Sequence, residues 1–167
     1  MRSNRINSVM AGLRIFQLGY FYNRALVGVE RNDQGIAALG VLQNGLMGYP
    51  QTAGGYPNVY YQRSIDHKTQ QEVKRLGWLT SPHGLSKQLM LGELKDAVDG
   101  GRLLIHCAAT LVEMDGYAYD PEKDDWVQAY RNPETKIAHT DEVMSLAIAN
   151  QMLKVSKTGA VRPKQDR

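Results

Sequence analysis

The expected fold depends on one stretch of sequence, Ala25-Leu26-Val27-Gly28-Val29-Glu30, which is followed directly by Arg31-Asn32-Asp33-Gln34-Gly35. A short, uninterrupted apolar run that stops at turn-forming residues is typical of a strand buried on both faces of a sheet. Because Glu30 ends this run, we expect it at the carboxyl edge of the sheet, where ligands and catalytic groups collect in open α/β folds. The alternative is that Glu30 is only the first solvated residue after a core strand.

Amphipathic helices are predicted on both sides of this strand. Apolar residues at spacings of three and four predict a first helix over residues 8–22, with Asn7 or Ser8 as its N-cap. A second helix is expected over residues 34–46, where one of Gly40 and Gly45 allows close packing and the other ends the helix. A helix that follows a buried strand is what a parallel α/β unit requires.

The rest of the chain is predicted to alternate between short strands and helices. In order, we expect a loop over 47–57, a strand over 58–62, an extended segment over 76–80, a helix over 86–99, a strand over 103–106, a helix over 108–114, a hairpin over 115–130 with its return strand at 126–130, a helix over 140–154, and a basic, disordered tail over 156–167.

Composition limits the class of protein. A chain of 167 residues has the length of one domain, and its 43% apolar and 22% charged residues are ordinary for a globular protein. Cys107 is the only cysteine, which excludes an internal disulfide and a cysteine-rich metal site. No apolar run approaches the ~20 residues of a membrane span, and the N-terminus lacks the apolar core of a signal peptide. We therefore expect a cytosolic protein without a membrane partner.

The net charge of +3 is mildly basic and permits contact with nucleic acid without demanding it. Cations are concentrated over residues 63–75, which are strongly polar. This stretch is either a solvated excursion or a basic flap near a polyanion. Asp66 and Glu72 dilute its positive charge and favour the first interpretation.

A second acidic group, His139-Thr140-Asp141-Glu142, precedes the apolar face of the last predicted helix. Carboxylates after a Thr N-cap are an ordinary way to complement a helix dipole. They are also the hard oxygen ligands that Mg²⁺ and Mn²⁺ prefer. If these carboxylates and Glu30 meet at one sheet edge, the pair is the minimum for metal-assisted phosphodiester hydrolysis.

Several segments together resemble the large subunits of phage terminases. Tyr22–Gly35 resembles the family's "YN-x-A…(V/I)E-x-N-x-x-G" segment, and residues 139–147 resemble its "HDD-x-VMALA" segment. Further similarities occur in the family's order between them: Leu76-Gly77-Trp78-Leu79-Thr80 to "GW-x-T", Ser86-Lys87 to "T-K", and Leu111-Val112-Glu113-Met114 to "E-L". The ordered set spans residues 10–154.

This resemblance implies the C-terminal nuclease domain of a terminase, over residues 1–155, with an RNase H-like (resolvase-type) mixed sheet flanked by helices. Such a domain hydrolyses concatemeric double-stranded DNA in the cytoplasm of the bacterial host, with Mg²⁺ or Mn²⁺ in a two-metal site. The terminase small subunit and the portal protein are its packaging partners.

The site residues that the resemblance implies are carried over position by position. Glu30 and Asp141 correspond to metal-binding catalytic carboxylates, and His139 to an auxiliary group near the scissile phosphate. Thr140 replaces the first Asp of the family motif, and Glu142 is the candidate that compensates as a metal ligand. The cations expected to contact DNA phosphates are Lys87, Arg63, Lys68, Lys74 and Arg75.

The chain also departs from the family. The family's first catalytic Asp lies on a strand before the first predicted helix, whereas Asp33 is the first Asp here, and no phosphate-binding Gly-x-x-x-x-Gly-Lys-Ser/Thr motif occurs. We therefore expect a terminase truncated at its N-terminus. Two alternatives stay open: a catalytically inactive prophage remnant that binds DNA or packaging proteins, and another RNase H-like enzyme such as a resolvase.

Overall fold

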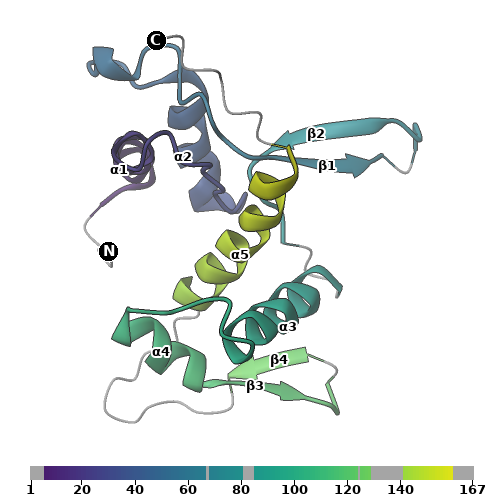
Figure 1. Ribbon diagram of the computed structural model, residues 1–167. Coiled ribbons are helices and arrows are strands. Elements are labelled where there is room, and N and C mark those ends of the chain that lie inside the picture. Colours follow the sequence, from purple (N-terminus) through teal and green to yellow (C-terminus); the bar gives the residue numbers. More distant parts are fainter. Residues whose placement is uncertain (1–5, 67, 81–84, 124, 129–140, 160–167) are drawn as a thin grey trace. The chain divides into compact units, whose positions relative to one another are not determined.

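The computed structural model describes residues 6–66, 68–80, 85–123, 125–128 and 141–159. The chain divides into two compact units, Met1–Thr80 and Ser81–Arg167, and each is described by itself. In the described residues the architecture is mixed α/β, with five α-helices, one short 3₁₀ helix and two small antiparallel sheets (Figure 1). None of the described helices combines the length and the apolar character that a membrane span needs.

Two packed helices begin the first unit, close to their predicted bounds. Helix α1 spans Ser8–Phe21, and the side chain of its N-cap Asn7 accepts a hydrogen bond from the N–H of Met10 at 2.9 Å. Helix α2 spans Asp33–Asn44 and ends at Gly45, whose φ of 78° favours glycine. The close packing between the helices occurs at Gly12, where a Cβ would lie 2.8 Å from the carbonyl oxygen of Ala38. Gly45 ends the helix, so Gly40 was the predicted site of close packing, but Gly40 has open space around it.

The core of the first unit joins these helices to the stretch that ends at Glu30. Phe16, Leu39, Leu42 and Tyr56 are buried together, and Val27 and Val29 pack against them. The Tyr56 hydroxyl donates to the carbonyl oxygen of Ala25 at 2.6 Å, which satisfies its polar end. In the loop before Tyr56, the 3₁₀ helix η1 spans Pro50–Thr52.

The predicted strand over residues 25–30 is not formed: this stretch makes two isolated parallel bridges and is part of no sheet in the described residues. Val27 bridges Val59, and Glu30 bridges Trp78. The prediction that this stretch is buried on both faces is wrong, because all six residues are half-buried. The reason is that the core packs against Val27 and Val29 of this alternating segment, and the described chain pairs with it only through isolated bridges.

Residues 61–76 form an antiparallel hairpin, which we call the ribbon. Strand β1 spans Tyr61–Ile65 and strand β2 spans Glu72–Leu76. The predicted strand over 58–62 is thus displaced toward the C-terminus, and the predicted excursion over 63–75 includes strand residues 63–65 and 72–75. This hairpin was not predicted because both of its faces are mostly exposed, so most of its side chains are polar and show no apolar alternation. Figure 1 shows the ribbon extending away from α1 and α2.

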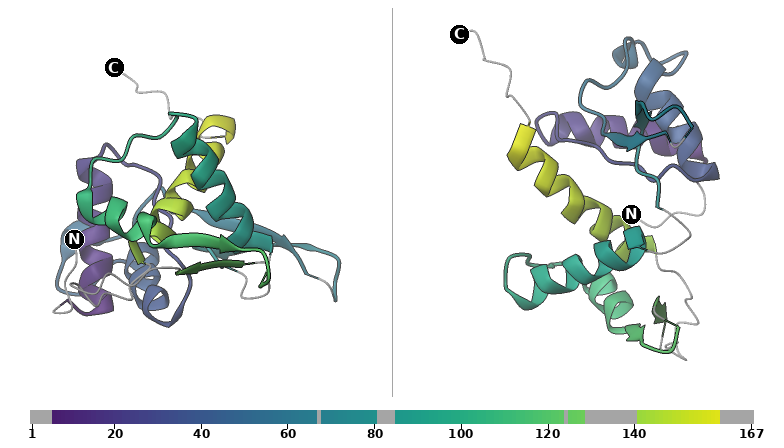
Figure 2. Two further views of the ribbon diagram at one scale, coloured as in Figure 1. Left: turned by 90° about the horizontal axis from the view of Figure 1, so that it is seen from below. Right: turned by 90° about the vertical axis from the view of Figure 1, so that its right-hand side faces the viewer.

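The second unit contains three helices and a small hairpin (Figure 2). Their bounds are α3 Leu85–Asp99, α4 Ala108–Asp115, β3 Tyr117–Asp120, β4 Asp125–Gln128 and α5 Asp141–Gly159. Helices α3 and α5 supply the core through Met90, Leu94, Val143, Ala147 and Ile148. These elements confirm the predicted helices over 86–99, 108–114 and 140–154 and the predicted hairpin, although α5 continues to Gly159.

The predicted strand over 103–106 is wrong, because no strand forms there. The N–H groups of Arg102 and Leu103 donate to the carbonyl oxygen of Ala97, so they close the end of α3 instead of joining a sheet. Leu104 is 76% exposed, which shows that this short apolar run does not enter the core. The predicted tail from residue 160 onward lies outside the described residues.

Candidate functional site

Glu30 lies where the extended segment of the first unit ends and α2 is about to begin. The N–H of Trp78 donates to the Val29 carbonyl at 2.8 Å, and the N–H of Arg31 donates to the Trp78 carbonyl at 2.6 Å. These two hydrogen bonds fix the backbone on either side of Glu30. Glu30 was predicted at the carboxyl edge of a sheet. In the described residues it ends an extended segment that has a parallel bridge to Trp78 but belongs to neither of the two sheets.

The side chain of Glu30 is held by Asn32. The amide nitrogen of Asn32 donates to a carboxylate oxygen of Glu30 at 3.3 Å, while its amide oxygen accepts from the N–H of Gly35 at 2.8 Å and caps α2. Within the described residues this is the one hydrogen bond to the Glu30 carboxylate, so most of its lone pairs are available to a ligand. Sequence reasoning treated Asn32 only as a turn residue, although an Asn three residues before Gly35 is an N-cap signal.

Gly35 allows the helix to start directly against the end of the extended segment. A Cβ at Gly35 would lie 1.8 Å from the carbonyl oxygen of Glu30, so only glycine fits at this distance. Neither Asn32 nor Gly35 carries a charge, so they position Glu30 without forming an ion pair with its carboxylate.

Two acidic residues of the second unit, Glu113 and Glu142, meet at the N-terminus of α5. The buried carboxylate of Glu113, on α4, accepts from the N–H groups of Glu142 at 2.9 Å and Val143 at 3.0 Å. The hydroxyl of Thr110 donates to the Glu142 carboxylate at 2.9 Å. Glu113, Glu142 and Thr110 thus form a clasp between α4 and α5. Sequence reasoning placed Glu142 among the metal ligands and gave Glu113 no role in the site.

Cys107 occupies the N-cap position of α4, three residues before Thr110 of this clasp. Hydrogen bonds from the side chain and N–H of Thr110 and from the N–H of Ala109 lower the pKa of the Cys107 thiol. The negative charge of Glu142 opposes this shift. The polar environment of the α5 N-terminus therefore comes from both helices.

The other predicted ligands are distributed as follows. Asp141 is the first residue of α5 and is exposed, while His139 lies outside the described residues. Glu30 belongs to the first unit and Asp141 to the second. In the ranges that the structure describes, no three His, Cys, Asp or Glu side chains are grouped so that they could hold a metal ion.

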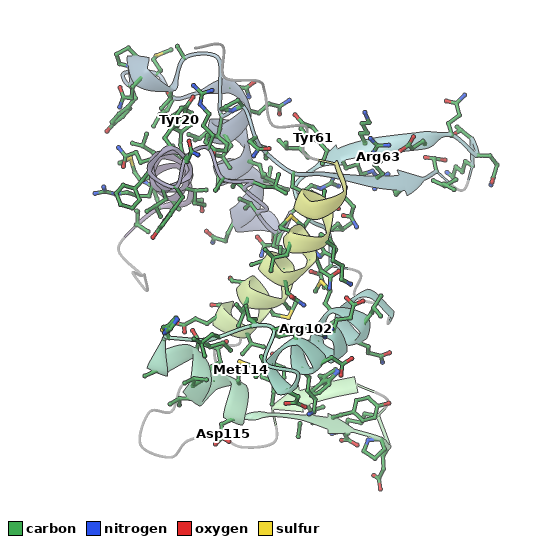
Figure 3. All side chains as sticks on the ribbon, viewed as in Figure 1. Tyr20, Tyr61, Arg63, Arg102, Met114 and Asp115 are labelled. Atoms are coloured by element: carbon green, nitrogen blue, oxygen red, sulfur yellow. The ribbon has the colours of Figure 1, made fainter. Side chains whose placement is uncertain are left out.

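Four of the five predicted DNA-contacting cations lie in the hairpin region. Arg63, Lys74 and Arg75 are on the ribbon strands and are exposed, and Lys68 lies in the turn between the strands. Figure 3 labels Arg63 on β1. Lys87 differs from them, because it lies on α3 and its ammonium donates to the carbonyl oxygen of Trp126 at 3.3 Å.

Comparison with known proteins adds no relative: neither a protein-family model nor a curated protein matches this chain.

Proposed function

We propose that this chain is a metal-dependent nuclease domain acting on double-stranded DNA, of the kind found in phage terminase large subunits, and that its fold is RNase H-like. Glu30 and Asp141 are the proposed metal ligands, and His139 is the auxiliary group near the scissile phosphate. One observation carries this proposal. Glu30 ends a segment fixed by parallel bridges, and its carboxylate has a single long hydrogen bond, from Asn32.

The Glu30 carboxylate suits a hard divalent cation. Mg²⁺ and Mn²⁺ bind through one or two protein carboxylates and keep water or substrate phosphate in their other positions. The half-buried setting of Glu30 and its hydrogen bond to Asn32 restrict the carboxylate while leaving oxygen lone pairs accessible. A bound cation would supply activated water and stabilise charge on the phosphate.

Nicking of supercoiled plasmid in Mn²⁺ tests this function. Glu30→Gln keeps the size of the side chain and removes its charge, so we expect nicking to fall by more than the ~10–100-fold that follows loss of an outer-shell partner. Asp33→Asn is the matched control, because Asp33 is a neighbouring carboxylate in the first turn of α2. It should leave the nicking rate within a few-fold of the wild type. An inert wild-type protein would contradict the nuclease.

A second candidate is a catalytically inactive remnant that binds DNA or packaging proteins. The clasp favours it, because Glu142 and Glu113 make structural hydrogen bonds at the place where the resemblance implies a metal site. Titration with Mn²⁺ separates the two candidates. If the chain is a nuclease, Mn²⁺ binding should be saturable and should be weakened in both Glu30→Gln and Asp141→Asn. If it is an inactive remnant, it should bind DNA without binding Mn²⁺.

A further inference from the structure

Two positively charged side chains of the ribbon lie opposite each other, which does not stabilise the strand pair. Its register places Arg63 directly opposite Lys74, so the two side chains project from the same face. Like charges directly opposite each other destabilise a strand pair. Glu72 offsets part of this repulsion through an exposed ion pair with Arg63 at 3.3 Å. Arg75 projects from the other face, opposite Gln62.

The ribbon is anchored firmly at its base and exposed beyond it. The Gln62 side chain accepts from the N–H of Leu79 at 2.7 Å, and the rings of Tyr60 and Trp78 lie 5.8 Å apart. Leu76 packs against the core of the unit, whereas the side chain of Arg63 is 68% exposed. Figure 3 shows Tyr61 at the base and Arg63 farther along β1. A cationic two-stranded element with a fixed base is suited to enter a groove.

The base of the ribbon also adjoins Glu30. Trp78, which bridges Glu30, follows the last residue of β2 by two positions. The base of the ribbon and Glu30 are thus joined through the backbone within the first unit.

We propose that the ribbon binds duplex DNA by entering the major groove, with Arg63 and Lys74 contacting phosphates. The major groove of B-DNA, ~12 Å wide, admits a two-stranded β-ribbon. The ribbon suits single strands less well, because Tyr61 at its base is the only aromatic residue of its two strands and binding of single strands relies on aromatic stacking. The choice of duplex DNA as the ligand rests on the proposed function. The choice of Arg63 and Lys74 as the contacting residues follows from the register and exposure of the ribbon.

Fluorescence anisotropy of a labelled DNA duplex, measured in EDTA so that no cleavage occurs, tests this binding. Arg63→Gln/Lys74→Gln keeps polar side chains on exposed strands and removes two charges. Loss of two phosphate contacts should reduce the slope of log K against log salt by about two, since each contact contributes about 0.9. At moderate salt the affinity should fall on the order of tenfold.

The matched control is Lys95→Gln/Lys123→Gln, which removes the same charge from two exposed lysines outside the ribbon. Its salt slope should equal that of the wild type. An equal loss in the control, or an unchanged slope in the ribbon variant, would overturn the proposal. Ribbon-dependent binding of duplex RNA with equal affinity would overturn the major-groove mode, because the A-form major groove is too deep and narrow for such entry.

This experiment separates binding from cleavage. If Glu30→Gln binds the duplex normally and the wild type cleaves no plasmid, the nuclease proposal fails while the ribbon proposal stands. If Arg63→Gln/Lys74→Gln nicks and binds like the wild type, the ribbon proposal fails while the nuclease proposal stands. Circular dichroism of each variant confirms that the fold is retained.

Discussion

Helices α2 and α5 both begin beside a predicted site, but their N-termini are satisfied in different ways. Helix α2 is capped locally by the side chain of Asn32, two residues after Glu30. Helix α5 is capped by Glu113, which comes from another helix. The local amide cap leaves the Glu30 carboxylate with one long hydrogen bond, whereas the distant cap occupies a carboxylate with two backbone N–H groups.

This difference separates a carboxylate that holds the fold from one that is available for chemistry. A buried carboxylate that accepts from backbone N–H groups stabilises a helix terminus and has fewer lone pairs for a metal. A half-buried carboxylate with one weak partner can take a ligand without dismantling a helix. In this chain Glu113 is of the first kind and Glu30 is of the second.

The largest expected effect breaks the α2 side of this comparison. Gly35→Ala places a Cβ 1.8 Å from the Glu30 carbonyl oxygen, so α2 must shift and we expect a loss of about 3 kcal/mol in the free energy of unfolding. Gly40→Ala in the same helix meets open space and should stabilise by about 0.5–1 kcal/mol. Each change is made in a Trp126→Phe variant, so that Trp78 fluorescence during urea unfolding reports the stability of the first unit. Equal and small effects would contradict the close approach at Gly35.

A somewhat smaller effect breaks the α5 side. Glu113→Ala removes the acceptor for two N–H groups in a buried position, and we expect a loss of about 2–3 kcal/mol in the free energy of unfolding. Glu113→Gln keeps an acceptor oxygen and should cost about 1 kcal/mol. The control Glu122→Gln changes an exposed residue of the hairpin turn and should stay within about 0.5 kcal/mol.

Trp126 fluorescence in a Trp78→Phe background reports these changes in the second unit. If Glu113→Ala were as mild as Glu122→Gln, the clasp would not hold α5.

The smallest expected effect is a pH dependence of the second unit's stability, which comes from Glu93 and its partners on α5. Hydrogen bonds from Lys154 and then Gln151, both on α5, lower the pKa of Glu93 below its ordinary value of 4.5. A carboxyl whose pKa is lower in the folded protein contributes stability above its unfolded pKa, and this contribution is lost as the pH falls through the folded pKa. We therefore expect the second unit to weaken as the pH drops below about 4.5. In Glu93→Gln this acid dependence should be shallower in urea titrations across that range; a dependence identical to wild type would exclude Glu93 as its source.

The helices could be predicted because their apolar spacing decides them. The apolar side chains that α1 buries, Leu13 and Phe16, belong to the pattern that predicted it, and α3 buries Met90 and Leu94 in the same way. The N-terminus of α5 was also predicted within one residue, from Thr140 as its N-cap. These signals are local, so they can be recognised without knowledge of the tertiary structure.

The ribbon and the clasp could not be predicted, for two different physical reasons. The ribbon strands carry few apolar residues, and their pairing of residues such as Arg63 with Lys74 depends on backbone hydrogen bonds that leave no periodic pattern. The clasp joins Glu113 to the N–H groups of residues 142 and 143, which are distant in sequence. Of the candidate site, the end of the extended segment at Glu30 was predictable, whereas its isolated bridge to Trp78 and its support by Asn32 and Gly35 required the structure.

The two parallel bridges also affect how the protein folds. Val27–Val59 and Glu30–Trp78 close loops of roughly 30 and 50 residues, while α1 and α2 are neighbours in the chain. Closing long loops requires entropy to be lost before contacts form, so local helix pairs form early and distant strand contacts form late. We therefore expect Glu30 to reach its position late in folding. Such late contacts also open first in the native state, so hydrogen exchange at the Arg31 and Trp78 amides should be faster than in α1.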